Sequence, residues 1–321
     1  MIIEEMKKKI KDKNKILVLP EGDDIRILRA AIRLKKENLC NPLLLGEKEK
    51  IEQLANKNNL NIDGLNILNP VDDSEFDSNV NKMFELRKGK NSLEDCMELL
   101  KGRNYYAIML LYNGKADAAL GGATYSTADT IRPALQIIKT KPTSKIVSSC
   151  FYMNKEGKEP LIFADCAINV DPTSEELKDI AKDSADSARV FDIEPRVAFL
   201  SFSTMGSAKH EHVSKVSEAV RLLKEEGANF EFDGELQFDA AIVESVGKQK
   251  APNSKVAGKA NVFIFPTLNA GNIGYKIAQR LGDYEALGPI LQGIRKPIND
   301  LSRGCDEEDV YKMAIITLNQ G

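Results

Sequence analysis

Short apolar runs alternate with amphipathic helical segments along the chain, and this alternation constrains the fold more than any other feature. Residues 15–19 form an apolar run that ends in a polar turn, and residues 25–36 then show the helical spacing of apolar side chains. The same order returns at residues 41–57, and another apolar run follows at 65–68. Parallel strands need crossover connections, which are usually helices. The pattern therefore predicts an α/β fold with mainly parallel sheets covered on both faces.

Further helix and strand signals continue this order. Residues 76–114 have helical character, with Ser92 as a plausible cap and Gly114 as a stop. Thr173 and Glu176 have the spacing of a capping box and predict the start of another helix. The remaining predicted strands lie at 116–122, 146–153, 161–167, 196–202 and 261–265, and the second and third of these are expected to form a paired edge.

The length of the chain indicates two domains. It has 321 residues, and a single core stops growing at about 250–300 residues. A Lys-Pro-Thr-Ser segment at 141–144 has the composition of a linker, and a second crossing is expected near residue 297. We predict a first α/β domain from residues 1–143 plus 298–321, and a second from 144–297.

Composition restricts the classes of partner. The net charge is −3, with 42% hydrophobic and 29% charged residues, which is ordinary for a soluble globular protein and gives no basic field for nucleic acid. The N-terminus lacks an apolar core of signal-peptide length. Nowhere do about 18 apolar residues run together, as a membrane span requires. We expect a cytoplasmic protein that binds small molecules, with no nucleic-acid or membrane partner.

The cysteines and histidines argue against metal and disulfide chemistry. The five cysteines are odd in number, scattered and without CxxC spacing, which favours reduced thiols. A nucleophilic cysteine needs a nearby base, yet neither His210 nor His212 lies near Cys166 or Cys305 in the sequence. We therefore expect these two cysteines to pack in the interior, the two histidines to lie at the surface, and no metal to be bound.

A glycine pair followed by hydroxyl side chains marks one candidate ligand site. The strand predicted at 116–122 ends in Gly121-Gly122, and residues 123–130 form a hydroxyl-rich loop that leads into a helix carrying Arg132. Loop N–H groups and hydroxyls donate hydrogen bonds to phosphate, and an arginine neutralises it. Serine and threonine are also ordinary N-caps. The segment is therefore either a phosphate loop or a capped helix start.

A second candidate site lies near the C-terminus. Ser302, Arg303 and Asp309 place a hydroxyl, a guanidinium and a carboxylate within eight residues. Apolar spacing from residue 310 onward predicts a final helix that starts near Asp306, and the free N–H groups at a helix start favour an anion. The bland interpretation is that Asp306 and Asp309 only cap this helix. Both interpretations stay open from the sequence.

Several longer motifs, taken together and in order, resemble the phosphate acetyltransferase (phosphotransacetylase) family. The likeness begins at Pro20-Glu21-Gly22 and extends to the final helix, in the short single-module form of the phosphate acetyl/butyryltransferase family. The most specific motifs lie at residues 126–136, 163–167, 233–240, 266–272 and 296–304. Five motifs in the same order are a far stronger signal than any one of them.

The resemblance implies a fold and a reaction. The fold would be the two-domain α/β arrangement of isocitrate and isopropylmalate dehydrogenases, with the active-site cleft between the domains, in a homodimer. The reaction would transfer an acetyl group between acetyl phosphate and coenzyme A, by direct attack of the thiolate and without an acyl-enzyme. Coenzyme A would be a substrate, and no tightly bound cofactor is expected.

The resemblance also assigns residues. Ser302, Arg303 and Asp309 would lie at the reacting centre, with Asp309 as the base for the thiol. An aspartate in the first turn of a helix normally has a lowered pKa, so this role would require burial or a neighbouring carboxylate. The other residues that match the family are Arg87 and Arg132 as anion-binding groups and Ser126 and Thr127 as phosphate-loop hydroxyls, while Tyr125 and Asp306 depart from the histidine and serine expected there.

Three other functions stay open from the sequence. A phosphate butyryltransferase would share the fold and the chemistry. A metal- and NAD-dependent decarboxylating dehydrogenase of the same fold would need a cluster of aspartates, for which Asp233 and Asp239 are a thin case. A non-enzymatic two-domain protein would close around an anion without forming a thioester.

Overall fold

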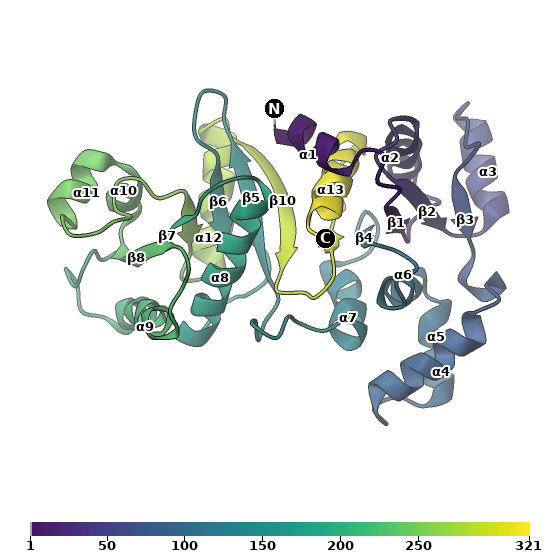
Figure 1. The fold of residues 1–321 in the computed structure, drawn as a ribbon, viewed down its shortest axis with the longest axis horizontal. Helices are drawn as coiled ribbons and strands as arrows, with labels where there is room; N and C mark the ends of the chain where they lie inside the picture. Colours follow the sequence, from purple (N-terminus) through teal and green to yellow (C-terminus); the bar gives the residue numbers. More distant parts are fainter. Residues whose placement is uncertain (1) are drawn as a thin grey trace. The chain divides into compact units, whose positions relative to one another are not determined.

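The computed structural model describes residues 2–321, and the chain divides into two compact units (Figure 1). Unit 1 consists of the residues up to Lys139 together with Ile294–Gly321, and unit 2 consists of Thr140–Gly293. The second crossing of the chain therefore returns the C-terminal segment to the first unit. The domain boundaries expected at 143 and 297 stay predictions.

Unit 1 is built on a parallel sheet. Its five strands run in the order β11 (Ile298–Asp300), β4 (Ala118–Gly121), β1 (Ile16–Leu19), β2 (Asn41–Leu45) and β3 (Asn66–Leu68), and every neighbouring pair is parallel. The mainly parallel sheet expected from the alternating pattern is thereby confirmed. The C-terminal strand β11 joins the sheet beside β4, which no local pattern at 298–300 predicted.

The helices of unit 1 cover both faces of this sheet. They are α1 (Ile2–Ile10), α2 (Ile25–Lys36), α3 (Lys48–Lys57), α4 (Phe76–Arg87), α5 (Leu93–Lys101), α6 (Arg103–Tyr112), α7 (Thr127–Ile137) and α13 (Glu307–Asn319), with a short 3-10 turn at Pro70–Asp72. Helices α1, α2 and α13 pack together, and α6 packs against α7 and β4 (Figure 1). Helix α1 was not predicted, and the helical stretch 76–114 is divided into three helices, the second of which starts at the predicted cap Ser92.

Unit 2 contains a mixed sheet. The order is β10 (Glu285–Gln292), β5 (Ser148–Asn154), β6 (Leu161–Ala164), β9 (Val262–Ile264), β7 (Arg196–Leu200) and β8 (Glu231–Leu236). Strands β5 and β6 pair as predicted, in antiparallel orientation, but β10 covers the outer side of β5, so this pair is not the edge. The flanking helices are α8 (Ser174–Val190), α9 (Glu211–Glu226), α10 (Phe238–Ile242), α11 (Glu244–Lys250) and α12 (Leu268–Leu281).

Strand β10 was missed because its sequence contains turn signals. Gly288 and Pro289 lie in its middle, and proline is excluded from central strands since it cannot donate to the ladder. In the structure β10 is an edge strand whose register shifts between Leu287 and Ile290, beside these two residues. A bulged edge strand tolerates a proline. Gly288 and Pro289 therefore interrupt the regular pairing, as their residue types indicate, but they do not end the strand.

The predicted helix starts are confirmed at atomic detail. Ser92 and Thr173 each cap a helix through a capping box. A third box joins Asp306 and Asp309, with 2.8 Å between the Asp309 amide nitrogen and Asp306 Oδ1. These boxes satisfy N–H groups that a helix start otherwise leaves free.

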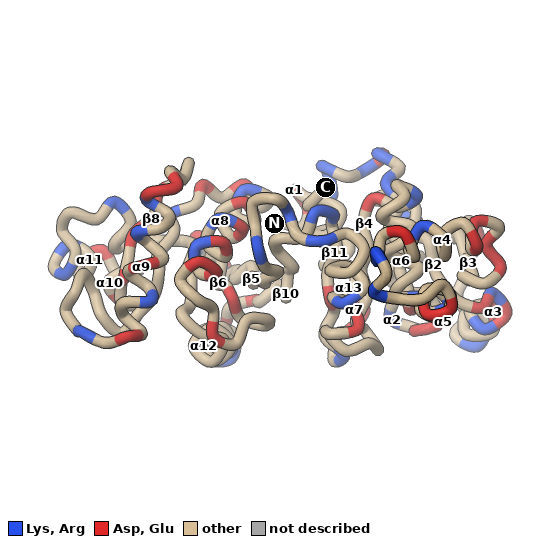
Figure 2. Tube along the Cα trace, turned by 90° about the horizontal axis from the view of Figure 1, so that it is seen from below, with Lys and Arg blue, Asp and Glu red and all other residues tan. Residues whose placement is uncertain are grey.

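The distribution of charged residues and the apolar character of the helices agree with the composition. Lys and Arg residues are interspersed with Asp and Glu residues in each unit (Figure 2). All five cysteines are free and buried, which fits the reduced thiols expected for all of them and the interior packing expected for Cys166 and Cys305. Within residues 2–321, no helix combines the length and the apolar character needed to span a membrane.

Asp183 is a buried acid whose side-chain oxygens are not both hydrogen-bonded. It lies in α8 with 4% of its surface exposed, and no group in the described part of the chain bonds to its Oδ2 atom. A side-chain bond from Ser144 lowers the pKa, but burial dominates and raises the pKa of Asp183 to about 6. Because the folded chain holds this proton more tightly than the unfolded chain does, stability falls as the pH rises from about 4 to about 6.

We therefore expect Asp183→Asn to stabilise the protein above pH 6. The gain should reach at most about 3 kcal/mol, since one pKa unit corresponds to about 1.4 kcal/mol, and should vanish near pH 4. Urea unfolding followed by far-ultraviolet circular dichroism at several pH values measures it. An equal loss of stability at all pH values would contradict this account of Asp183.

Candidate active site

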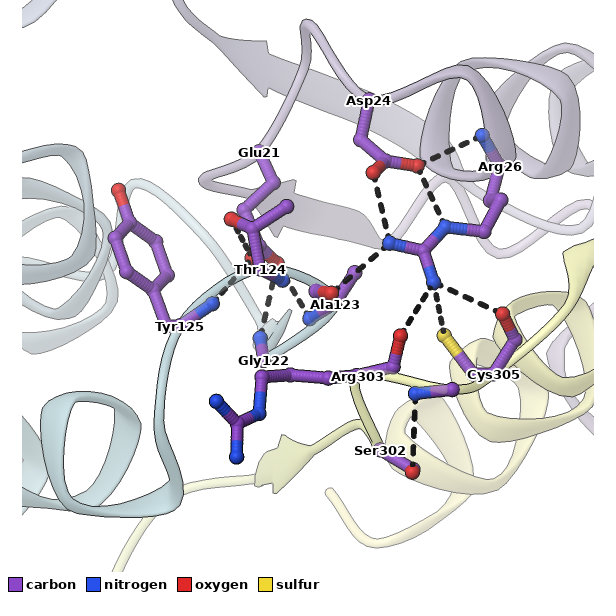
Figure 3. A network of polar contacts seen from close by, with 11 residues as sticks. Glu21, Asp24, Arg26, Gly122, Ala123, Thr124, Tyr125, Ser302, Arg303 and Cys305 are labelled. Atoms are coloured by element: carbon purple, nitrogen blue, oxygen red, sulfur yellow. Dashed lines mark hydrogen bonds and ion pairs between the residues drawn. The ribbon is translucent and has the colours of Figure 1, made fainter.

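Three loops of unit 1 come together at one edge of its sheet. Strands β1, β4 and β11 are parallel neighbours, so their carboxyl ends lie at the same edge. The loops that follow them are residues 20–24, 122–126 and 301–306 (Figure 3). Both candidate segments from the sequence, the hydroxyl-rich loop and the Ser302 loop, are therefore brought to one place.

Glu21 holds the loop after β4 in position. Its carboxylate is 1% exposed and accepts hydrogen bonds from the backbone N–H groups of Gly122 at 2.9 Å, Ala123 at 3.0 Å, Thr124 at 2.5 Å and Tyr125 at 3.1 Å. The Thr124 hydroxyl adds a bond at 2.6 Å. These loop N–H groups face a carboxylate, so they are not available to an anionic ligand. Sequence reasoning assigned no role to Glu21, although this residue lies in the Pro20-Glu21-Gly22 segment where the family likeness begins.

Gly122 is required where β4 and β11 end. Its φ is +105°, and a Cβ atom there would lie 2.2 Å from Asp300 Oδ1 and 2.7 Å from the Leu301 nitrogen. Asp300 is 1% exposed, and its Oδ1 has no partner in residues 2–321. Burial raises the pKa of Asp300, while a bond from the Thr127 hydroxyl opposes this shift.

The first turn of α7 combines capping with free donors. The Ser126 hydroxyl accepts from the Asp129 amide at 3.2 Å and lies 2.6 Å from the Asp129 carboxylate, so Ser126 is the N-cap. Thr127 is exposed, and its hydroxyl opposes the rise that burial causes in the pKa of Asp300. The first N–H groups of a helix lack intrahelical acceptors. The amides of Thr127 and Ala128 are thus the donors left for an anion, and the capping interpretation of Ser126 is confirmed.

The charges of Arg87 and Arg132 both act on one tyrosine, although the two arginines are distant in sequence. Arg132, in α7, has a 57% exposed side chain 3.6 Å from Asp129. Arg87 ends α4, and its Nε donates to Asn91 at 2.7 Å. Burial raises the pKa of Tyr105, and the charges of Arg132 and Arg87 both act against this rise. Both cations therefore act electrostatically on Tyr105 in unit 1, and Arg132 lies within the helix that starts at Thr127.

Tyr125, where the family resemblance leads one to expect histidine, lies beside another arginine. Burial raises the pKa of the Tyr125 phenol, and the positive charge of Arg103 opposes that rise. Arg103 itself bonds to Asp23 at 2.6 Å. The Tyr125 side chain therefore lies beside an arginine that is already paired with a carboxylate.

The Ser302 loop presents an unpaired cation. Ser302 and Arg303 are exposed, and the loop is closed by bonds from the Cys305 amide to the Ser302 carbonyl at 2.9 Å and from the Gly304 amide to Ser302 Oγ at 3.3 Å. The guanidinium of Arg303 extends away from the loop, and no described residue pairs with it (Figure 3). It is free to meet an anion.

Asp309 and Cys305 lie next to this loop in different environments. Asp309 is exposed, and its carboxylate accepts from the Asp306 amide at 3.1 Å. Its capping role is confirmed, and the burial that its proposed role as a base would require is not seen within unit 1. Cys305 is buried, and burial raises the pKa of its thiol to about 11, so it is not a nucleophile at neutral pH.

Arg26 links the two loops and was not identified from the sequence. It lies at the start of α2, and its guanidinium donates to the carbonyl oxygens of Ala123, Arg303 and Cys305, each at 2.9 Å (Figure 3). Burial raises the pKa of Asp24, but bonds from Arg26 outweigh burial and lower it. No local motif signals these contacts, because the three carbonyls come from distant parts of the chain.

We expect Gly122→Ala to destabilise unit 1 by about 2–5 kcal/mol, from the positive φ and the overlap with Asp300 together. The matched control is Gly114→Ala, where φ is +72° but no atom lies within 4 Å of the added Cβ. That variant should lose only about 1–2 kcal/mol. Urea unfolding of both variants tests this, and equal losses would show that the contact with Asp300 is unimportant.

Comparisons with known proteins identify the family of this chain. The family model described as Phosphate acetyl/butaryl transferase matches residues 1–318. A phosphate acetyltransferase of Bacillus subtilis (strain 168) is 50% identical over 315 residues, which cover 98% of this chain and 97% of the relative. A solved phosphotransacetylase from Streptococcus pyogenes is 51% identical, with a TM-score of 0.97, over 99% of this chain and 97% of that chain.

A more distant solved structure shares the fold. The branched-chain phosphotransacylase from Enterococcus faecalis V583 is 18% identical, with a TM-score of 0.69, over 95% of this chain and 98% of that chain. Together, the family model across nearly the whole chain and relatives at half identity show that this chain belongs to the phosphate acetyl/butaryl transferase family.

Proposed function

We propose that the loops at the carboxyl edge of the unit 1 sheet carry the reacting centre for acetyl transfer between acetyl phosphate and coenzyme A. The chain is an enzyme of the phosphate acetyltransferase type, as its relatives at about 50% identity over 98% of its length are. The observation that carries the proposed site is the exposed Arg303 guanidinium, unpaired among the described residues, on a loop that Arg26 ties to the loop preceding α7.

The chemistry requires neutralisation of negative charge. The phosphate group of acetyl phosphate carries negative charge next to the carbonyl group. Attack by the thiolate sulfur places further negative charge on the carbonyl oxygen. A carbon–sulfur bond forms, the bond between the carbonyl carbon and the phosphate oxygen breaks, and phosphate leaves with the electron pair. We assign Arg303 and Ser302 to this charge, because arginine offers a planar, permanently charged fork.

A second group of donors is assigned to substrate anions. The amides of Thr127 and Ala128 carry the partial positive charge of a helix start. The Thr127 hydroxyl lies beside them, and the Ser126 hydroxyl could donate to a substrate only by giving up its bond to the Asp129 carboxylate. Arg87 and Arg132 add two charges near Tyr105. Glu21 supports this arrangement, since it consumes the N–H groups of the preceding loop and thereby defines which donors face the ligand.

Typical free energies show whether thiol deprotonation or stabilisation of the developing charge contributes more to catalysis. Full deprotonation of a thiol with a pKa of about 8.5 costs roughly 2 kcal/mol at pH 7. A single well-placed donor to a developing oxyanion contributes about 2.7–4 kcal/mol. Charge stabilisation by Arg303 should therefore exceed the contribution of Asp309 as the base for the thiol.

Other expectations rest on the family alone. We propose a homodimer in the cytoplasm that uses coenzyme A as a substrate and needs no tightly bound cofactor. The named relatives favour acetyl over butyryl transfer and give no support to a decarboxylating dehydrogenase. Comparing initial rates with acetyl and butyryl phosphate tests the acyl preference, and a faster rate with the butyryl compound would overturn it.

We expect Arg303→Gln to lower kcat by about 100- to 1000-fold, as loss of an oxyanion donor does, without changing the melting temperature. The assay follows the ultraviolet absorbance of the thioester after mixing with acetyl phosphate and coenzyme A. The control is Arg221→Gln, which removes an exposed arginine paired with Glu218 and Glu225 on α9. Wild-type turnover in the Arg303 variant would remove this residue from the mechanism.

Asp309→Asn should lower the rate by at most about 30-fold at pH 7, the equivalent of roughly 2 kcal/mol. The deficit should shrink above about pH 8.5, where the thiol ionises without a base. Asp306→Asn is the control, because it perturbs the same capping box and leaves Asp309 in place. If the two variants gave the same pH–rate profile, Asp309 would act only as a cap.

A further inference from the structure

We propose that Arg26 is a positioning residue for acetyl transfer, holding the Ser302–Cys305 loop in the conformation that presents the Arg303 guanidinium. The inference rests on the proposed function of Arg303 and assigns a separate role to a residue that does not itself meet the substrate.

All donors of Arg26 are consumed inside unit 1. A guanidinium has five N–H donors and no acceptor. Nε bonds to Asp24 Oδ1 at 3.0 Å, and Nη2 bonds to Asp24 Oδ2 at 2.8 Å and to the Ala123 carbonyl at 2.9 Å. Nη1 bonds to the carbonyls of Arg303 and Cys305, both at 2.9 Å. No donor is left for a substrate, so Arg26 cannot bind an anion without breaking these contacts.

The charge of Arg26 is also compensated locally. Asp24 pairs with it in a bidentate contact, and Asp24 is the N-cap of α2, so both side chains start from a fixed helix turn. In contrast, the Arg303 guanidinium has no partner among the residues that the structure describes (Figure 3). The two arginines therefore have different roles. Arg26 holds backbone carbonyl groups in place, and Arg303 exposes its charge to solvent.

The carbonyl groups that accept hydrogen bonds from Arg26 include those that set the backbone position of Arg303. Arg26 fixes the carbonyl of Arg303 itself and that of Cys305, two residues later. On the strand side, the Leu301 amide bonds to the Gly121 carbonyl at 2.7 Å. The loop is thus anchored before and after Arg303, and the bond to the Ala123 carbonyl ties it to the loop that Glu21 holds.

A lysine cannot reproduce this arrangement. Its ammonium has three donors on a flexible stem and no planar fork. Arg26→Lys keeps the charge and can still pair with Asp24, but it cannot reach that carboxylate and three carbonyls together. Displacement of a catalytic group by about 1 Å can cost about 100-fold in rate, so loosening this loop should be visible in turnover.

The test compares Arg26→Ala and Arg26→Lys with the wild type. We expect kcat to fall about 10- to 100-fold in both, with the KM for acetyl phosphate changed less than about 3-fold, since no substrate contact is removed. Added guanidinium chloride at sub-denaturing concentration should restore part of the kcat of Arg26→Ala, because the side chain is only 25% exposed and leaves a shaped site.

The matched control is Arg33→Ala on the same helix. Arg33 also joins α2 to α13, through an ion pair with Glu308 at 2.5 Å and a stack 3.6 Å above the Tyr311 ring. If helix attachment alone matters, Arg33→Ala and Arg26→Ala should behave alike. We expect Arg33→Ala to lower the melting temperature, to keep the wild-type kcat and to show no response to guanidinium.

Hydrogen exchange gives a readout that does not depend on activity. Amides of residues 301–306 should exchange faster in Arg26→Lys than in the wild type, while those in the middle of α13 should not change. Unchanged exchange together with a kcat within about 2-fold of wild type would overturn the proposal, and so would a loss confined to KM. Failure of the wild type itself to form the thioester would instead refute the proposed function, so it is measured first.

Discussion

The buried carboxylate of Glu21 is the interaction on which the site depends. A buried charge is costly unless hydrogen bonds replace the water it loses. Glu21 receives bonds from four consecutive backbone N–H groups and one hydroxyl, which provides that replacement. The loop after β4 cannot change conformation without exposing those groups or the carboxylate to an apolar interior. The start of α7, with the donors assigned to the substrate, therefore has a fixed position relative to the sheet.

Unit 2 uses the same device at its own strand ends. Asp165 follows β6, is 1% exposed and accepts from the amides of Ala167 at 3.0 Å and Asn169 at 2.9 Å. Glu235, near the end of β8, accepts from the Gly206 amide at 2.7 Å and from the Ser203 hydroxyl at 2.9 Å. Loops at strand ends are usually the mobile part of an α/β protein. Here carboxylates inside each unit make them part of the rigid frame.

The arginines of unit 1 show how similar side chains take different roles. Arg26, in α2, donates to three carbonyls and a carboxylate, whereas Arg303 extends from the loop that Arg26 holds and has no partner within residues 2–321. Arg87 and Arg132 lie between these extremes, each with one polar neighbour. The sequence cannot separate these roles, because a guanidinium binds backbone or ligand according to what the fold places beside it.

The sequence by itself determined the features that depend on local physics. The alternating apolar pattern predicted parallel strands with covering helices, and the spacing of Thr173 with Glu176 and of Asp306 with Asp309 predicted helix starts, because caps involve residues three apart. Ordered motifs also indicated the family. Only the tertiary structure revealed β10, the partners of Glu21 and Arg26, and the approach of Arg87 and Arg132 to Tyr105. Each of these joins distant segments, and such contacts are decided by packing rather than by neighbours in the chain.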